Sequence, residues 1–532
     1  MSTNVTSGFT TNINSVSNLA TDYPLLVGAF GGIVATYTFF WALLRLTQDA
    51  KEPVLVSTSI PFLSPIFGMI RWNMSFYNHM KDKYPQIPIY TLRLPGTRLY
   101  IVNSTALIPV IQRQWRTLLF PPITAKASEA VMGGSKEAID ILRQDMVTEN
   151  GCLPAFIKVV HPTLSAGPAL DELNGKAMEV ISHSLDKIIA NGPTRVKMFE
   201  WVRQELLLAT SNSVYGPANP LRDSKNMEAW HKYHPTIMFL MLDLFPHWVF
   251  KQGIRGREQL VKSFARYQSE GQFNEGSTFI QRWVKHFSSQ GISEPDIARF
   301  HVGSLFALVA NTIPTAFWTI FHILSDSSLL EDCRKEISHA VQEQDGICTV
   351  DSNYIKSSCP TLLSTFQEVL RFHGMGNSVR VADEDQMLDG KYLIKKGGLV
   401  MMPARVQHRM QSVWGDSVDV FDPRRFVRKA GSNRPNPVAF RGFGGGTTLC
   451  PGRHFATTEI LLFAAMILLR FDVYPVSGLW ITPTTANSSQ AEAMEQPDSD
   501  IDIELRPRPG ADRTWRFSFG GGREAAIVAE DI

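Results

Sequence analysis

A long run of apolar positions lies close to the amino end of the chain. Residues 23–44 contain no charged side chain, and a helix of that length can cross a hydrocarbon core of roughly 30 Å. Residues 1–22 contain no Lys or Arg, whereas Arg45 and Lys51 follow the run, which fits a cleaved signal peptide poorly. We therefore predict a short lumenal tail at 1–22, a single-pass transmembrane anchor at 23–45 and a cytoplasmic body.

The pattern of the body predicts mostly helices and a few strands. Prolines interrupt the apolar stretch after the anchor, which we interpret as a stiff connector over residues 46–70. Two short strands are expected at 87–92 and 98–102, joined by a Pro-Gly turn. From about 120 to 290 the apolar positions recur as they do in helices with one half-buried face. The predicted fold class is mainly α with a small β-sheet region (α+β).

A long helix is predicted to begin at Ser293, where Ser-x-x-Asp is a helix-start signature, and to continue to about Leu324. Residues 302–321 carry no charge, so a second membrane span is one interpretation. Polar residues in the middle argue against it and favour a helix in the core of a large domain, because polar groups are costly in lipid. Pro314 should kink this helix and leave the carbonyl of Ala310 without its usual partner.

Composition argues against several classes of function. Lys and Arg number 52 and Asp and Glu 50, so the formal charge of +2 gives no argument for a nucleic-acid partner. Five cysteines in so long a chain form neither a disulfide framework nor a zinc-finger spacing, which indicates a reducing compartment. The middle of the chain has no Gly/Ser/Pro linker, so we expect one catalytic domain at 71–520 and a disordered tail at 521–532.

One cysteine has an unusual setting. Residues 443–452 are Phe-Gly-Gly-Gly-Thr-Thr-Leu-Cys-Pro-Gly, and an apolar helix pattern follows. The thiolate form binds metal, and backbone N–H donors with a helix N-terminus would hold its charge. Cys450 is therefore a candidate axial ligand for iron, with Phe443 shielding the sulfur and Gly446 and Gly452 letting the backbone approach a flat cofactor. An inert buried cysteine and a phosphate-binding turn are the alternatives, although the third glycine of the latter is missing.

This decapeptide resembles the cysteine-ligand signature of the cytochrome P450 family, Phe-x-x-Gly-x-Arg-x-Cys-x-Gly, with Thr448 where the family usually has a basic residue. The resemblance extends upstream. Glu368-x-x-Arg371, then the Phe-x-Pro-x-Arg-Phe run that contains Arg425, then the cysteine turn follow in the family's order. By this resemblance Glu368, Arg371 and Arg425 form a buried network that supports the cysteine loop, whereas an isolated Glu-x-x-Arg is ordinarily a surface pair.

The resemblance also implies the cytochrome P450 fold and a haem b cofactor. A cysteine thiolate on haem iron is the oxygen-activating arrangement, because the thiolate favours O–O cleavage. In the family an arginine at the place of Arg380 binds a haem propionate, whereas a solvated strand-end arginine is the alternative. Most members carry an acid followed by threonine over the haem. This chain has Ile-Pro there, so Asn311, Thr312 and Thr315 are expected to face oxygen or substrate.

Residues 310–318 and Thr448 resemble the branch that contains the sterol hydroxylases of bile-acid synthesis and prostacyclin synthase, and also fungal membrane enzymes that tailor terpenoids. The implied enzyme is a microsomal monooxygenase of the endoplasmic reticulum membrane that uses O2 on an apolar terpenoid or steroid-like substrate. Electrons would come from NADPH-cytochrome P450 reductase, since the chain has no flavin or nicotinamide fingerprint, at a face bearing Arg441 and Arg453. A haem-thiolate isomerase or dehydratase that needs no reductase, and a haem sensor or carrier, are the alternatives.

Overall fold

The computed structural model describes residues 23–56, 59–242, 247–428 and 436–520. The tails predicted at 1–22 and 521–532 lie outside these described residues. The described part is mainly helical with small sheets, as the sequence predicts. Its helices are α2 (Pro24–Leu46), α3 (Ser64–Trp72), α4 (Ser75–Lys83), α5 (Leu107–Arg113), α6 (Pro121–Ala130), α7 (Lys136–Arg143), α8 (Cys152–Leu164), α9 (Pro168–Ala190), α10 (Met198–Tyr215), α11 (Ser224–Tyr233), α12 (Ile237–Leu242), α13 (Lys251–Ser269), α14 (Thr278–Ser289), α15 (Glu294–Val309), α16 (Thr312–Ser325), α17 (Ser327–Ser338), α18 (Ser352–Ser358), α19 (Pro360–Phe372), α20 (Ala404–His408), α21 (Gln411–Trp414) and α22 (Arg453–Arg470).

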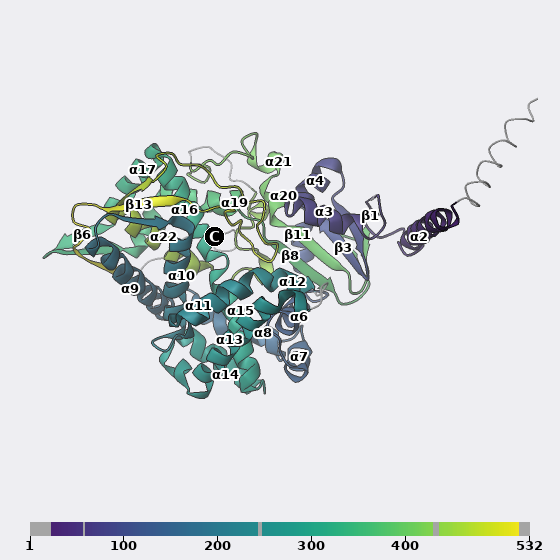
Figure 1. The fold of residues 1–532 in the computed structure, drawn as a ribbon, viewed down its shortest axis with the longest axis horizontal. Helices are drawn as coiled ribbons and strands as arrows, with labels where there is room; N and C mark the ends of the chain where they lie inside the picture. Colours follow the sequence, from purple (N-terminus) through teal and green to yellow (C-terminus); the bar gives the residue numbers. More distant parts are fainter. Residues whose placement is uncertain (1–22, 57–58, 243–246, 429–435, 521–532) are drawn as a thin grey trace, which may run out of the picture.

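The largest sheet lies on the side of the body from which α2 projects (Figure 1). Its strands are, in spatial order, β1 (Val54–Leu55), β2 (Ile89–Leu94), β3 (Thr97–Val102), β11 (Leu399–Pro403), β8 (Asn377–Ala382) and β4 (Leu118–Leu119). The smaller sheets are β12 (Phe471–Pro475), β13 (Asp502–Pro507) and β5 (Thr194–Lys197); β14 (Thr514–Ser518), β7 (Ile347–Asp351) and β6 (Val341–Gln344); and β10 (Tyr392–Ile394) with β9 (Gln386–Leu388). The predicted hairpin is β2–β3, and Gly96 has the positive φ of 69° that its tight turn requires.

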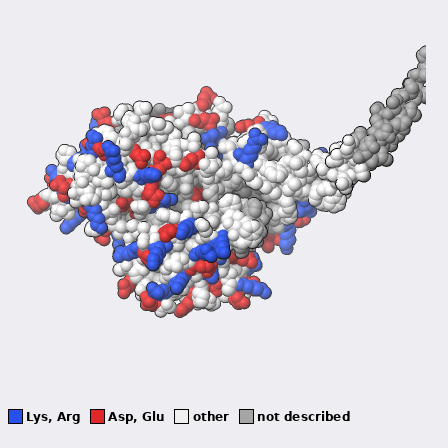
Figure 2. Space-filling model, in the orientation of Figure 1, with Lys and Arg blue, Asp and Glu red and all other residues white. Residues whose placement is uncertain are grey.

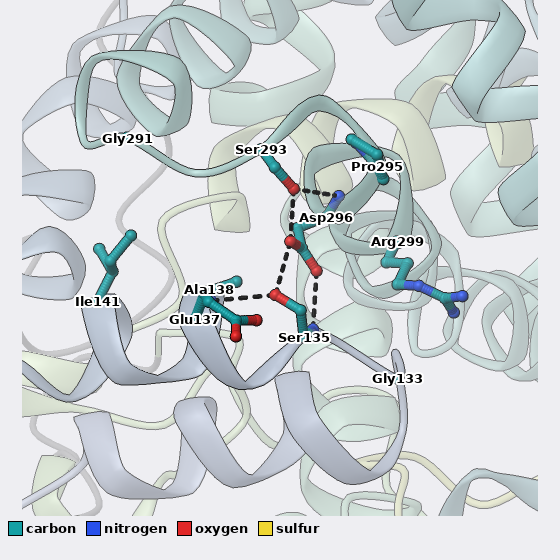
Figure 3. A pocket seen from close by; sticks show the side chains of 10 residues that line it. All are labelled: Gly133, Ser135, Glu137, Ala138, Ile141, Gly291, Ser293, Pro295, Asp296 and Arg299. Carbon is teal, nitrogen blue, oxygen red and sulfur yellow. Dashed lines mark hydrogen bonds between the residues drawn. The ribbon is translucent and has the colours of Figure 1, made fainter.

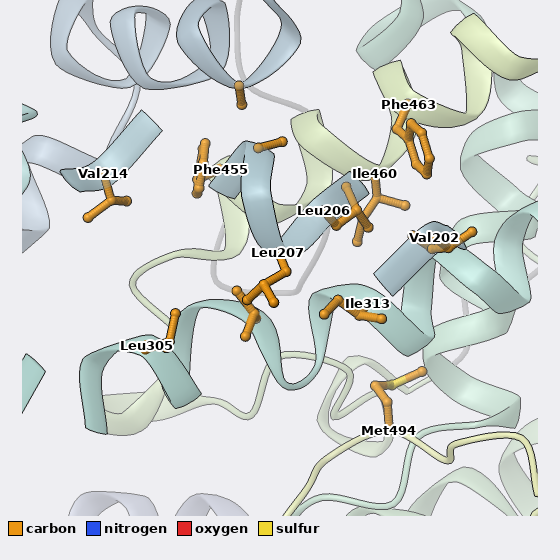
Figure 4. Packing of buried hydrophobic residues seen from close by; sticks show 14 of the residues in the cluster. Val202, Leu206, Leu207, Val214, Leu305, Ile313, Phe455, Ile460, Phe463 and Met494 are labelled. Atoms are coloured by element: carbon orange, nitrogen blue, oxygen red, sulfur yellow. The ribbon is translucent and has the colours of Figure 1, made fainter. Parts of the chain in front are cut away.

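The core of the body is built around α22, which follows the cysteine loop directly. Every side chain from Ile460 to Leu468 is almost fully buried, the pattern of a helix that is apolar all round because protein surrounds it. Figure 4 shows Leu206 of α10, Ile313 of α16 and Ile460 of α22 in one apolar cluster. The loop that carries Cys450 is therefore attached to the centre of the molecule.

The two long apolar helical segments have opposite surroundings. The membrane-length segment of α2 is not buried at all, whereas the segment Glu294–Ser325 is 72% buried within the body. In Figure 2 the projecting part of α2 is white, while Lys, Arg, Asp and Glu are mixed over the body. The basic residue of α2, Arg45, lies in its last turn. The second segment is therefore a core helix, and the alternative of a second membrane span is wrong.

The predicted continuous helix from 293 to 324 is wrong in one respect, because it breaks into α15 and α16 at Ala310 and Asn311. The break lies one turn before Pro314, whose ring nitrogen cannot donate to the carbonyl of Ala310. The amino end of α15 follows the prediction, since the Ser293 hydroxyl accepts from the Asp296 N–H at 3.4 Å. Proline thus interrupts the helix where the pattern of the sequence predicts a kink.

The range 46–70, predicted as a connector, contains two regular elements. Val54 and Leu55 form β1 and pair in parallel with Tyr90 and Thr91 of β2, and α3 begins at Ser64. Part of this range therefore belongs to the folded body rather than to a linker.

Candidate active site around Cys450

The cysteine loop closes on itself through backbone hydrogen bonds. The Cys450 N–H donates to the Phe443 carbonyl at 3.0 Å, and the Leu449 N–H donates to the Gly446 carbonyl at 3.0 Å. Gly444 and Gly446 adopt positive φ angles of 80° and 59°, which side chains other than glycine rarely tolerate. Gly444 and Gly446 are therefore required by the turn itself.

Cys450 differs from Cys152 and Cys359 in what opposes the effect of burial on its pKa. Burial raises the pKa of the Cys450 thiol, while a hydrogen bond from the Gly452 N–H and the charge of Arg453 lower it. Gly452 caps α22, so the positive end of that helix adds to the effect. Burial raises the pKa of Cys152 to about 11 and, with the charge of Glu336, that of Cys359 to about 12. Cys450 has the setting that a metal-binding thiolate needs.

The structure brings Glu368, Arg371 and Arg425 together in the interior. Arg371 donates to both oxygens of Glu368 at 2.7 Å, and Arg425 Nε lies 3.0 and 3.1 Å from the same two oxygens. The remaining guanidinium donors bind backbone carbonyls of the segment 408–420. Glu368 is 0% and Arg371 1% exposed, so this is a buried network and not the surface pair that isolated spacing would suggest.

Helix α19 also contacts the start of the cysteine loop. A Cβ on Gly442 would lie 3.0 Å from Cβ of Leu370, which sits between Glu368 and Arg371 in sequence. The Arg441 N–H donates to His408 Nε2 at 2.8 Å. The network and the loop are thus joined by direct packing, because α19 holds both.

Arg380 of β8 also contacts the cysteine loop. Its Nη2 donates to Thr448 Oγ1 at 2.6 Å and its Nη1 to the Val379 carbonyl at 2.9 Å. Arg380 is 2% exposed, so it is not a solvated arginine at a strand end. Burial, together with the nearby charge of Arg441, lowers the pKa of Arg380 to about 10. It therefore stays charged at neutral pH.

The three polar residues predicted on the oxygen side lie at the break between α15 and α16. The Thr312 hydroxyl donates to the Leu308 carbonyl at 3.0 Å and the Thr315 hydroxyl to the Asn311 carbonyl at 2.6 Å. The Asn311 side-chain oxygen accepts from the Ala493 N–H at 2.7 Å. The Thr312 hydroxyl thus connects α16 to the last turn of α15, and the Thr315 hydroxyl binds the residue that caps α16. The Asn311 side chain ties the break to a distant loop.

That loop contains a polar group that sequence reasoning missed. Glu495 is 6% exposed and binds Arg405 and His373 Nδ1, the latter at 3.1 Å, while its carbonyl accepts from Trp318 Nε1 at 2.8 Å. His373 continues the chain of contacts to His322, with 2.9 Å between their Nε2 atoms. No motif marks Glu495, because its partners come from three other parts of the chain.

A surface pocket of about 520 Å³ lies elsewhere, where the amino ends of α7 and α15 meet (Figure 3). Asp296 accepts from the N–H and hydroxyl of Ser135, both at 2.8 Å, and from the Ser293 hydroxyl at 2.6 Å. Because both carboxylate oxygens are used in joining the two helix starts, this pocket is a structural joint. No residue of the cysteine loop lines it.

Arg441 and Arg453 do not form the partner-facing surface that we expected. Arg441 is 7% and Arg453 9% exposed, and Arg453 Nη1 donates to the Cys450 carbonyl at 3.3 Å. That expectation is wrong, because the sequence reveals their charge but not their burial. Both arginines act within the protein.

Comparisons with known proteins agree with this arrangement. The family model described as Cytochrome P450 matches residues 223–494. The chain is 33% identical over 488 residues to cytochrome P450 monooxygenase nodJ of Hypoxylon pulicicidum, covering 89% of this chain and 93% of that protein. It is 27% identical over 465 residues to a cytochrome P450 monooxygenase of Gibberella zeae (85% and 88%) and 23% identical over 488 residues to cytochrome P450 7B1 of Mus musculus (84% and 90%). Because the match extends over nearly the whole chain and includes the cysteine turn, the protein belongs to the cytochrome P450 family of haem-thiolate monooxygenases.

Proposed function

We propose that the protein is a membrane-anchored monooxygenase in which Cys450 is the thiolate ligand of a haem b iron. The observation that carries this proposal is the position of Cys450 at the start of α22, where the Gly452 N–H opposes the effect of burial on its pKa. When bound, haem supplies the oxygen-activating redox chemistry. Phe443 shields the sulfur from water, and Gly446 and Gly452 allow the backbone to approach the cofactor.

On the oxygen side, Asn311, Thr312 and Thr315 are the residues that we propose to face O2 or substrate. The Asn311 oxygen is taken by Ala493, and its amide nitrogen has no partner among the described residues. The break before Pro314 also leaves the Ala310 carbonyl without a helical donor. A water molecule held between these two groups would move protons in place of the family's usual acid and alcohol.

The proposed substrate is an apolar terpenoid or steroid-like compound, and the proposed electron donor is NADPH-cytochrome P450 reductase. Two kinds of relatives support the substrate class. They are fungal monooxygenases and sterol enzymes, one of which, from Cricetulus griseus, is named cholesterol 7-alpha-monooxygenase and is 25% identical over 265 residues. An external donor fits a chain that has no nicotinamide or flavin fingerprint.

The test is oxygen incorporation. The purified protein is incubated with a panel of sterols and terpenoids, labelled O2, NADPH and the reductase, and products are analysed by mass spectrometry. We expect one labelled oxygen atom per oxidation and no product without the reductase. Unlabelled product that forms without reductase would replace this proposal by an isomerase or dehydratase. Cys450→Ser should remove the red-shifted band of the reduced carbon monoxide complex, with Cys359→Ser as the control.

We propose further that α2 anchors the protein in the endoplasmic reticulum membrane with the body in the cytoplasm. The exposed apolar surface of α2 (Figure 2) supports this, as does Arg45 at its carboxyl end. Deletion of residues 1–46 should increase the fraction that sodium carbonate releases from membranes. Protection of the carboxyl terminus from protease in intact microsomes would reverse the orientation.

A further inference from the structure

The carboxyl end of α2 lies against the hairpin β2–β3. The carbonyl of Thr47, the residue that caps α2, accepts from Arg98 Nη2 at 3.0 Å and from Arg93 Nη1 at 3.4 Å. Cations at a helix C-terminus are favourable, because the last carbonyls carry partial negative charge. Figure 1 shows β1 and β3 at the edge of the body from which α2 projects. The two arginines therefore mark the place where α2 joins the body.

This arginine pair has an unequal supply of partners. Arg93 and Arg98 lie directly opposite each other on antiparallel strands, a position where like charges repel. Arg98 Nε lies 3.3 Å from a carboxylate oxygen of Glu52. Arg93 has no carboxylate within ion-pair distance among the described residues, and its guanidinium contacts the Thr47 carbonyl and the ring of Phe62. Burial, together with the charge of Arg98, lowers the pKa of Arg93.

Other charged groups around the pair do not reverse this balance. Asp49 and Asp385 both pair with Lys395, at 3.9 and 2.9 Å. Arg45 in the last turn of α2 and the exposed Lys51 add positive charge. Among these groups and the pair itself, the positive charges outnumber the carboxylates.

The length of α2 sets the depth of the pair in a bilayer. At 1.5 Å per residue its 23 residues extend over about 34 Å, slightly more than a hydrocarbon core of roughly 30 Å. The end of α2 and the arginines that bind Thr47 would then lie in the headgroup layer. Phe62 supports this placement, since its ring lies 6.0 Å from that of Phe40, which is within the span. Arg93 thus has an aromatic ring on the membrane side and its charge at the headgroups, as snorkelling arginines do.

We propose that Arg93 and Arg98 bind the phosphate of an anionic phospholipid in the cytoplasmic leaflet. This inference rests on the proposed role of α2 as the membrane anchor. Both side chains are partly exposed, Arg98 by 28%, and arginine suits a phosphate because its planar donors bind two oxygens at once. A phosphate between the two guanidiniums offsets their repulsion. It also attaches the body to the membrane at a second point, which restricts rotation of the body about the axis of α2.

The test uses the haem-loaded full-length protein reconstituted into phosphatidylcholine vesicles. Electron spin resonance with spin-labelled phosphatidylserine and spin-labelled phosphatidylcholine gives the ratio of their association constants with the protein. Arg93→Gln and Arg98→Gln each remove one charge of the pair. Arg195→Gln is the control, because the Arg195 side chain is 71% exposed on β5 and pairs with Glu504 of β13, on the side of the body opposite α2 (Figure 1).

We expect the parent and Arg195→Gln to prefer phosphatidylserine equally. Arg93→Gln should lose about fivefold of this preference, the size expected for one basic residue at an anionic membrane surface. Arg98→Gln should lose a similar amount, and circular dichroism checks that each variant is folded.

Three results would overturn the inference. The parent could enter the vesicles without preferring phosphatidylserine, or both pair variants could keep the parental preference. Inorganic phosphate could also displace phosphatidylserine more strongly than sodium chloride does at equal ionic strength, which would make this a site for a free anion. A parent protein that sodium carbonate removes from the vesicles would instead overturn the proposed anchor.

Discussion

Two places in this molecule bury a pair of arginines, and they differ in what neutralises the charge. Arg371 and Arg425 both donate to Glu368, and each of its two carboxylate oxygens accepts from both arginines. Arg380, beside Arg441, has a hydroxyl and a backbone carbonyl as acceptors. The first site is complete as protein, whereas the Arg380 guanidinium has no carboxylate partner among the described residues. A buried charge of this kind is what we expect where an anionic ligand binds, and a charge neutralised within the chain is what we expect of a structural site.

The largest effect should come from Glu368→Ala. This change leaves two buried guanidiniums without their carboxylate, which costs roughly 3 to 5 kcal/mol, a large share of the total stability of a domain. We expect little folded haem protein on expression. The matched control is Glu200→Ala, because Glu200 and Arg203 have the same i,i+3 spacing but are each about one-third exposed. Normal yield, haem content and melting temperature in Glu368→Ala would show that the network is dispensable.

Arg380→Met should separate the two sites. Methionine removes a buried charge that no carboxylate of the described residues neutralises, so the fold should be retained, as circular dichroism and thermal melting will show. Haem retention should fall ten- to hundredfold, because a hydrogen bond to a charged group contributes about 1.5 to 3 kcal/mol. The ratio of haem to protein after gel filtration measures this. If Arg380→Met fails to fold, as we expect of Glu368→Ala, the two sites do not differ in this way.

From the sequence we could predict those features of the two buried arginine sites that depend on local pattern. The glycine turn at 443–452 and the Glu-x-x-Arg spacing on α19 are short-range features, and the structure places the predicted network residues together. The sequence could not predict contacts between unmarked positions far apart in the chain. Asn311 binds Ala493, 182 residues away, and the Gln112 side chain of α5 lies beside Gly446 of the cysteine loop although no motif marks it. Nor could charge alone show that Arg441 is buried.

Glu459 of α22 is a third buried ionisable group, and its raised pKa favours the protonated, neutral form. Burial raises the pKa of Glu459 to about 8, opposed by a hydrogen bond from Thr210. The unfolded carboxyl loses its proton near pH 4.5. Between these two values the folded protein binds more protons than the unfolded chain, so its stability falls as the pH rises.

Glu459→Gln keeps the neutral form of this side chain at every pH. We expect it to raise stability by roughly 3 kcal/mol near pH 7, with a gain that grows from pH 5 to pH 8. Melting temperatures of parent and variant across this range measure the gain. Parallel curves would mean that Glu459 is ionised in the folded protein as it is in the unfolded chain.

The smallest expected effect is at Asn311, whose side chain has one hydrogen-bonded group and one group without a partner among the described residues. Its oxygen binds the Ala493 N–H at 2.7 Å, while its amide nitrogen has no partner in the described part of the chain. Asn311→Leu loses both groups, whereas Asn311→Asp keeps the acceptor and loses the donors. If the donors hold a proton-delivering water, both variants should slow product formation several-fold, the scale of one lost hydrogen bond, and raise the share of NADPH electrons that form peroxide, at unchanged haem content. If Asn311→Asp couples like the parent, the role of Asn311 is to hold the loop at Ala493, and proton delivery belongs to other groups at the helix break.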